Sequence, residues 1–276
     1  MSDWAEWIGR SERRFDVLTQ GVIDRLRATT DSADHGPVAP QGIHWCLCLP
    51  DAPTAQLGAD GHPVRGGFLP PIALPRRMWA SSTVEFLRPL RAGDTIERMS
   101  TIRDIAHKSG NSGELIFVTL DHMTLANGTA AVRETQTIVY RAAANGGLPP
   151  APPSNAATAL PSGVMAQRIV IPQSPQLLRY SALTFNAHRI HYDLPYARDA
   201  EGYRGLVVHG PLTATLLLDC AARVVGGNQL RQFAFRGLVP AFAGEEMALS
   251  ATRDGDALIL LAVGPDGIAM RAQANA

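Results

Sequence analysis

"PLTATLLLDCAARVV", residues 211–225, decides the fold more than any other stretch of the chain. Wound as a helix, it is apolar on nearly every side, and only Asp219 and Arg223 carry charge. A helix that is apolar all round is buried inside a protein. The stretch therefore predicts a central helix that is wrapped by a sheet.

Strand-like runs stand before and after this helix. Residues 78–142 hold four such runs, separated by turns such as "KSGNSG" and "ANGT". After residue 165, "AQRIVIP" is typical of a strand, and three further runs end the chain, one of them with a hairpin at "RDGD". The pattern predicts an α+β protein with two antiparallel meanders.

A weak internal repeat links the two meanders. "FLRPLRAGDTI" starts at residue 86 and "FRGLVPAFAGEEM" at residue 235. In each, glycine and an acid lie four and five residues after a proline: Pro89, Gly93, Asp94 and Pro240, Gly244, Glu245. We interpret this as two copies of one α+β unit, with chance similarity as the alternative. Only the second copy keeps a long helix, because residues 51–77 are dense in Gly and Pro.

The Ala-, Pro- and Gly-rich stretch at 142–163 is typical of a linker. We therefore predict an N-terminal unit over 1–145, a linker over 146–163 and a C-terminal unit over 164–276. Local patterns also predict a helix over 10–30, a strand at "IHWCLCLP" (43–50), and a short helix capped by Ser174 with Pro175 at its first position.

Composition narrows the class of protein. The formal net charge is zero, so nothing indicates a nucleic-acid or membrane partner. The odd set of Cys46, Cys48 and Cys220 predicts buried thiols rather than disulfides. The N-terminus does not read as a secretory signal, and no run approaches the roughly 18 apolar residues of a membrane helix. We expect a cytoplasmic protein with no metal and no redox cofactor.

"NAHRIHYD", residues 186–193, resembles the hydratase-2 signature of the MaoC-like hydratases, usually Asp-x-Asn-Pro-Ile/Leu-His. In that alignment Asn186 stands where the family has its catalytic Asp, and His191 stands at the family's His. His188 and Arg189 replace the Asn and the Pro. "VVHGPLT", at 207–213, resembles the His-Gly segment that opens the family's central helix.

With "DGHP" and "GGFLPPIALPRRMWA" upstream, the chain resembles most the double-hot-dog branch of these enzymes. That branch contains mesaconyl-C4-CoA hydratases, itaconyl-CoA hydratases and type 2 hydroxyacyl-thioester dehydratases. The resemblance implies two curled antiparallel sheets, the C-terminal one wrapped around a long helix. Two fused hot dogs supply a dimer unit internally, so a monomer and a homodimer both stay open.

Hydration of an enoyl thioester needs a base for water, an acid for Cα and donors for the thioester oxygen. His191 is the expected base, because an imidazole titrates near working pH. Asn186 is expected to hold the water, although its amide cannot ionise. His191 then carries both protons, which we favour; the alternatives are that His188 shares the work or that the site is inactive. Gly210 opens the helix, so its N–H is the expected oxyanion donor.

The remaining candidates would bind substrate. His188 and His209 are expected to contact it, with bracing and helix capping as their alternatives. Phosphates of CoA, or a second carboxylate on the acyl group, call for arginines, and we expect these at Arg65, Arg76, Arg77 and Arg88. Surface solvation is the alternative for each. The N-terminal unit would then supply the acyl pocket and the C-terminal unit the chemistry.

The predicted function is reversible hydration of an acyl-CoA thioester, preferably a short dicarboxylic one such as itaconyl-CoA or mesaconyl-C4-CoA, giving citramalyl-CoA. CoA belongs to the substrate, and no other cofactor is expected. A fatty-acid-type 3-hydroxyacyl-thioester dehydratase, a hot-dog thioesterase and a non-catalytic thioester-binding protein are the alternatives, since a fold alone does not fix function.

Overall fold

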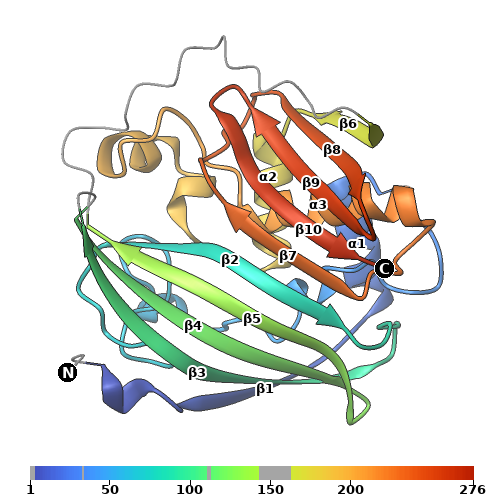
Figure 1. Cartoon of the computed structure of the whole chain (residues 1–276). Helices are drawn as coiled ribbons and strands as arrows, with labels where there is room; N and C mark the ends of the chain where they lie inside the picture. Colours follow the sequence, from blue (N-terminus) through green and yellow to red (C-terminus); the bar gives the residue numbers. More distant parts are fainter. Residues whose placement is uncertain (1–3, 33, 111–112, 143–162) are drawn as a thin grey trace.

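The computed structural model of the chain describes residues 4–32, 34–110, 113–142 and 163–276. Ten antiparallel strands form one continuous sheet in the order β1-β3-β4-β5-β2-β7-β10-β9-β8-β6 (Figure 1). The strands are β1 (Ser11–Val17), β2 (Arg76–Phe86), β3 (Thr95–Gly110), β4 (Gly113–Ala126), β5 (Thr129–Arg141), β6 (Val164–Val170), β7 (Gln232–Gly237), β8 (Met247–Asp254), β9 (Ala257–Gly264) and β10 (Gly267–Asn275). The α-helices are α1 (Gln20–Thr30), α2 (Ser174–Leu183) and α3 (Gly210–Val225).

The two predicted sheets are the two halves of this one sheet. They join where β2 pairs with β7, from Ser81 opposite Arg236 to Glu85 opposite Gln232. Outward from this joint, one half runs β2-β5-β4-β3-β1 and the other runs β7-β10-β9-β8-β6. Each half thus repeats the same strand order, and the predicted α+β architecture is confirmed.

The weak sequence repeat marks equivalent turns in the two halves. The Gly93 N–H, just before β3, donates to the carbonyl of Leu18, which follows β1, at 2.8 Å. The Gly244 N–H, just before β8, donates to the carbonyl of Pro172, which follows β6, at 2.7 Å. The repeat therefore reflects shared structure. The proposed unit boundaries stay a prediction, and the linker over 146–163 lies outside the described residues except for Gly163.

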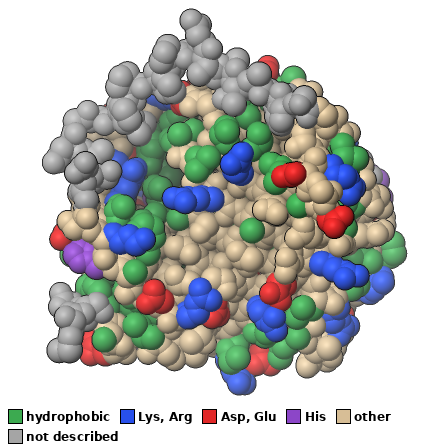
Figure 2. Space-filling model, viewed as in Figure 1, with side chains coloured by type: hydrophobic (Ala, Val, Ile, Leu, Met, Phe, Trp, Pro, Cys, Tyr) green, Lys and Arg blue, Asp and Glu red, His purple; other side chains and the backbone are tan. Residues whose placement is uncertain are grey.

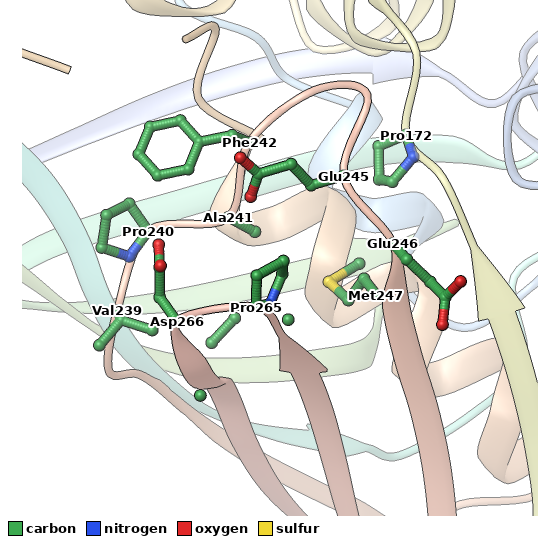
Figure 3. Close-up of a pocket in the computed structure, with 13 residues that line it drawn as sticks. Pro172, Val239, Pro240, Ala241, Phe242, Glu245, Glu246, Met247, Pro265 and Asp266 are labelled. Atoms are coloured by element: carbon green, nitrogen blue, oxygen red, sulfur yellow. The ribbon is translucent and has the colours of Figure 1, made fainter. Parts of the chain in front are cut away.

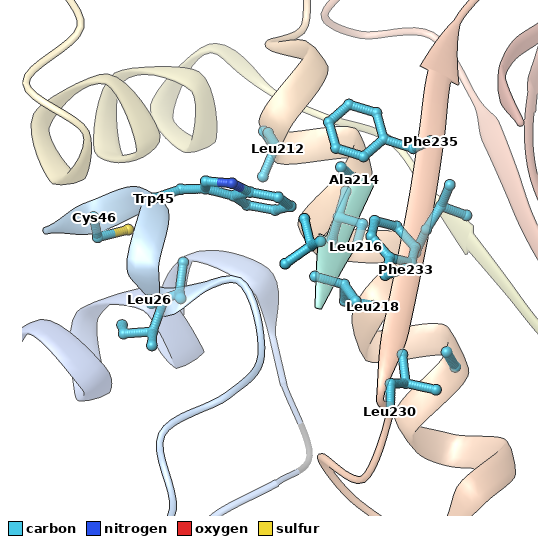
Figure 4. Close-up of a cluster of buried hydrophobic side chains, with 14 of the residues drawn as sticks. Leu26, Trp45, Cys46, Leu212, Ala214, Leu216, Leu218, Leu230, Phe233 and Phe235 are labelled. Carbon is cyan, nitrogen blue, oxygen red and sulfur yellow. The ribbon is translucent and has the colours of Figure 1, made fainter. Parts of the chain in front are cut away.

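Helix α3 is buried against the C-terminal half of the sheet. It contacts β6, β8, β9 and β10, and Leu212, Leu216 and Leu217 are wholly buried. Figure 4 shows its leucines beside Phe233 and Phe235 of β7. Between α1 and β2 the described residues form only short 3-10 helices, so the expected absence of a second long helix is confirmed.

Three local predictions were wrong in part or whole. Residues 11–17 form β1, whose side chains alternate in exposure, so the helix begins only at Gln20. "IHWCLCLP" forms a buried 3-10 helix over Ile43–Cys46, because a short apolar run does not distinguish a buried strand from a buried turn. Helix α2 begins as expected, but its N-cap is Gln173, with no side-chain capping bond from Ser174.

The surface and the thiols agree with the composition. Basic and acidic side chains are both spread over the face shown in Figure 2. The three cysteines are free and buried, as predicted. In the part of the chain that the structure describes, no helix is long and apolar enough to cross a membrane.

Candidate active site

Both halves of the chain line one large cavity, of about 1720 Å³. His62 and Arg77 of the N-terminal half lie on its wall. The C-terminal half contributes Asn186, His188, His191 and Gly210. A second hollow, at the turn before β8, measures only about 10 Å³ and holds none of the predicted site residues (Figure 3). That volume accommodates roughly one water molecule, so the large cavity is the candidate site.

His191 has one ring nitrogen fixed and the other available. It ends the 3-10 helix Arg189–His191, and its Nδ1 lies 2.7 Å from the Val207 carbonyl oxygen. A carbonyl can only accept, so Nδ1 carries the proton and Nε2 keeps its lone pair. Burial lowers the pKa of His191 to about 4, although the Val207 bond works against this. The imidazole is therefore neutral at pH 7 and can accept a proton.

His209 lies behind His191 rather than in the cavity. The two rings stack with centroids 3.6 Å apart and planes 18° apart. His209 is fully buried, and its Nε2 lies 2.8 Å from the Ser181 hydroxyl. The prediction that it binds substrate was therefore wrong: its place at the N-cap of α3 lets it fix the plane of the His191 ring.

Asn186 lines the cavity just after α2. Its Oδ1 accepts the His188 backbone N–H at 2.9 Å, which closes a tight turn. This bond uses one lone pair of the amide oxygen and leaves the NH₂ group to donate towards a ligand. Asn186 can therefore orient a ligand, but it has no proton to exchange near neutral pH.

Gly210 is the first residue of α3 and lies on the cavity wall. The first N–H groups of a helix have no acceptor within the helix and carry partial positive charge. The nearest atom to a Cβ added here would be the Trp79 carbonyl oxygen, at 3.9 Å. Gly210 is thus not tightly covered by the rest of the chain, and it lies where an oxyanion in the cavity could meet the helix N-terminus.

A loop of the N-terminal half docks directly on the "NAHRIH" segment. The Asp60 carbonyl accepts the Arg189 N–H at 2.9 Å, and the Ala59 carbonyl accepts the Arg189 guanidinium at 3.0 Å. This contact brings the His62 ring to 4.1 Å from the His188 ring, between centroids. The His188 ring in turn lies 5.5 Å from that of His191.

Residues Asp60 and His62 were missed as site residues by sequence reasoning. The "DGHP" stretch was noticed only as part of the family resemblance. His62 Nδ1 lies 3.0 Å from Asp60 Oδ2, and its ring lines the cavity. Nothing in the local pattern showed that this loop reaches a segment more than 120 residues away.

The cluster of Asp60, His62 and His188 could instead bind a metal ion. Asp60, His62 and His188 each offer one ligand atom, and these atoms lie within 4.8 Å of one another. However, Asp60 and His62 already satisfy each other by a direct hydrogen bond. Burial is the main cause of the lowered pKa values of His62 and His188; the Asp60 carboxylate opposes it, and the positive charge of Arg77 lowers both values further. The same charge would oppose a bound cation, so we interpret the cluster as a hydrogen-bonded group.

The four predicted arginines have different surroundings. Arg77 and Arg65 line the cavity, but the Arg65 guanidinium binds the carbonyls of Ile72 and Pro75. Arg76 is buried in an ion pair with Glu201, with 2.7 Å between Nε and Oε2. Arg88 lies beyond β2, away from the cavity wall. Arg76 and Arg88 are absent from the cavity wall, so the prediction that they contact substrate directly is not supported.

Comparison with known proteins places this cavity in a family. A family model described as hydroxyacyl-thioester dehydratase type 2 matches residues 42–243. The chain belongs to this family. It is 43% identical over 270 residues to a mesaconyl-C(4)-CoA hydratase of Chloroflexus aurantiacus. This alignment covers 96% of this chain and 95% of that protein.

Solved structures show the same fold at low sequence identity. HtdX of Mycobacterium tuberculosis has a TM-score of 0.71 at 14% identity, and the match covers 96% of this chain and 99% of that chain. Another protein of that organism, described as having a double hotdog fold, has a TM-score of 0.59 at 14% identity over 97% and 96% of the two chains. The expected double hot-dog fold is confirmed, and the chain is a hydro-lyase of the hydratase and dehydratase class.

Replacing Gly61 tests the docking of the loop. Gly61 has φ +88°, and an added Cβ would lie 1.9 Å from the Ala187 carbonyl oxygen. We expect Gly61→Ala to lower the free energy of unfolding by more than about 1 kcal/mol and to reduce activity, because the loop must move away from His188. Urea unfolding and a hydration assay measure both effects. Gly67→Ala is the control, since a Cβ there meets nothing within 4 Å; equal stability of the two variants would contradict the docking.

The buried histidines predict a loss of stability in mild acid. The pKa of His191 is about 4 in the folded chain and 6.5 in the unfolded chain. Below pH 6.5 the unfolded state therefore binds a proton at this residue that the folded state does not bind. Its contribution is complete above pH 6.5 and is lost as the pH falls towards 4. Between pH 7 and pH 5 this residue alone should lower the free energy of unfolding by about 2 kcal/mol. Urea unfolding should show a shallower decline in His191→Gln; an unchanged decline would contradict the assignment.

Proposed function

We propose that the chain reversibly hydrates mesaconyl-C4-CoA, the α,β-unsaturated CoA thioester of a short dicarboxylic acid, to citramalyl-CoA; itaconyl-CoA, whose double bond lies one carbon further from the thioester, is the other dicarboxylic candidate. The observation that carries this is one cavity wall with both a neutral imidazole and a helix N-terminus. His191 presents Nε2 as a base, and Gly210 presents a backbone N–H. The 43% identity to a mesaconyl-C(4)-CoA hydratase supports this choice of substrate.

The geometry suggests a sequence of bond changes. His191 Nε2 removes a proton from water as the water oxygen bonds Cβ. The electrons of the double bond move towards Cα and the thioester oxygen, whose negative charge the Gly210 N–H stabilises. Asn186 orients the water or the thioester with its NH₂ group. Protonation of Cα then completes the 3-hydroxyacyl thioester, and dehydration follows the same steps in reverse.

Arg77 is the residue that favours a dicarboxylic substrate. It lines the cavity, and its charge acts on both His62 and His188. Among the described residues, several other arginines form ion pairs with carboxylates, but Arg77 belongs to none of these pairs. A guanidinium beside the reacting atoms can hold the free carboxylate of the acyl group in a bidentate pair.

A fatty-acid-type 3-hydroxyacyl-thioester dehydratase is the second candidate. The cavity exceeds the roughly 300–1,000 Å³ of an ordinary ligand pocket. Leu115, Phe117 and Leu120 of β4 add apolar wall in the N-terminal half, where a longer acyl chain would fit. Oligomeric state and cytoplasmic location stay predictions.

A panel of thioesters tests the reaction. Wild type should hydrate mesaconyl-C4-CoA faster than crotonyl-CoA, followed by loss of the enoyl-thioester absorbance. Itaconyl-CoA has no such chromophore, so its hydration is followed by formation of citramalyl-CoA. His191→Gln should lower kcat about 10²–10⁴-fold, because it removes the base while keeping a polar side chain. Faster turnover of long-chain enoyl thioesters would favour the second candidate. Release of free thiol without hydration would overturn the proposal in favour of a thioesterase.

Arg77→Gln tests the carboxylate contact. A hydrogen-bonded ion pair with a ligand is worth about 1.5–3 kcal/mol, so KM for mesaconyl-C4-CoA should rise at least about tenfold. KM for crotonyl-CoA, which has no second carboxylate, should change by less than about twofold. Arg88→Gln is the matched control, because Arg88 lies away from the cavity. Equal effects of Arg77→Gln on both substrates would contradict a carboxylate subsite.

A further inference from the structure

The C-terminal half of the site offers one proton carrier, His191, for two proton transfers. Hydration takes a proton from water and gives a proton to Cα. Asn186 lies five residues before His191, where the resembled motif has its catalytic Asp. Its amide does not ionise near neutral pH. A second group that exchanges protons must therefore come from elsewhere, or His191 must perform both steps.

The docked loop brings such a group to the cavity. His62 lines the cavity wall, and its side chain is 21% exposed, whereas Asp60, at 23% exposed, is not part of the wall. His62 Nδ1 donates to Asp60 Oδ2 at 3.0 Å, and the Asp60 carboxylate also accepts the His62 backbone N–H at 3.0 Å. With Nδ1 held in this way, Nε2 is the nitrogen left to meet a ligand. A carboxylate that fixes the tautomer of an imidazole is the arrangement of a general acid–base pair.

We propose that Asp60 and His62 form the second acid–base group of this active site. His62 is the catalytic residue, because it faces the substrate cavity, and Asp60 is its positioning residue. The N-terminal half therefore supplies part of the chemistry, in addition to the acyl pocket. This inference rests on the proposed function, since it assigns the second proton transfer of that reaction.

The charges around His62 suit a group that gives up its proton readily. Burial lowers the pKa of His62, the Asp60 carboxylate opposes this, and Arg77 and Arg65 lower the pKa further. Burial alone would raise the pKa of Asp60, but its hydrogen bonds with His62 outweigh burial, so Asp60 stays ionised. His188 packs on His62 and is neutral, because burial lowers its pKa to about 2. Asp60 acts on both rings, but its carboxylate is hydrogen-bonded to His62, so His62 is the better placed of the two to hold a proton.

The proton balance closes with these two histidines. His191 Nε2 takes one proton from water as the oxygen–Cβ bond forms. His62 enters this step as the imidazolium, with Nδ1–H held by Asp60 and the second proton on Nε2. The electron pair of the double bond moves to Cα and forms a bond to the Nε2 proton, which leaves His62 neutral. The proton on His191 then returns to His62 through solvent water or through His188, whose ring neighbours both of the others. The net change is the addition of one water to the thioester.

The test compares His62→Gln, Asp60→Asn and a matched control, His107→Gln. His107 is on the surface, with its side chain 49% exposed. On the thioester that wild type hydrates best, His62→Gln should lower kcat about 10²–10⁴-fold, with KM and the melting temperature nearly unchanged. Asp60→Asn should lower kcat by at least about tenfold and shift the pH profile, because it keeps the side-chain size but removes the charge. The control should match wild type.

Two further measurements keep the inference open to contradiction. Imidazole added to His62→Ala should restore turnover in proportion to its concentration, which a purely structural role would not allow. Metal analysis of the wild-type protein should find no stoichiometric ion bound by Asp60, His62 and His188.

The results separate this inference from the proposed function. Wild type that turns over no enoyl thioester would overturn the function. An active wild type overturns only the assignment of His62 if His62→Gln keeps kcat within about threefold, if imidazole fails to rescue His62→Ala, or if a stoichiometric metal is lost in His62→Gln.

Discussion

The burial of α3 in the C-terminal half of the sheet is the constraint on which the site depends. Because its leucines are enclosed by β6 to β10, the helix has one position, and its N-terminus must face the cavity. That end brings Gly210 to the wall and places His209 under His191. The chain leading into it supplies the Val207 carbonyl, which selects the tautomer of His191. Packing of an apolar helix thereby sets the chemistry of a neutral base.

The two halves share a strand order but have diverged in role. The C-terminal half keeps the helix, while the N-terminal half replaces it with a long segment rich in Gly and Pro. This segment leaves room for the cavity, and its loop around Gly61 packs on the backbone of Ala187 so closely that no side chain fits. Residues of both halves therefore line the same cavity, Gly210 from the C-terminal half and His62 from the N-terminal half.

Sequence reasoning worked where the signal was local. The apolar run of 211–225 predicted α3 from one segment of sequence. The motif at 186–191 is likewise local, and the predicted Asn186, His191 and Gly210 do lie on one cavity wall. It did not find Asp60 and His62, because their role arises from a contact between distant segments. Adjacent arginines were likewise misjudged: Arg76 and Arg77 alternate along β2, so one is buried on Glu201 and the other faces the cavity.

The most direct measurement is a crystal structure of the chain with the CoA thioester of its hydrated product. The thioester oxygen should lie within about 3 Å of the Gly210 nitrogen, and the 3-hydroxyl group should lie within hydrogen-bonding distance of His191 Nε2. A thioester bound away from the N-terminus of α3, or a hydroxyl that does not approach His191, would contradict the central claim that this helix and this histidine perform the reaction.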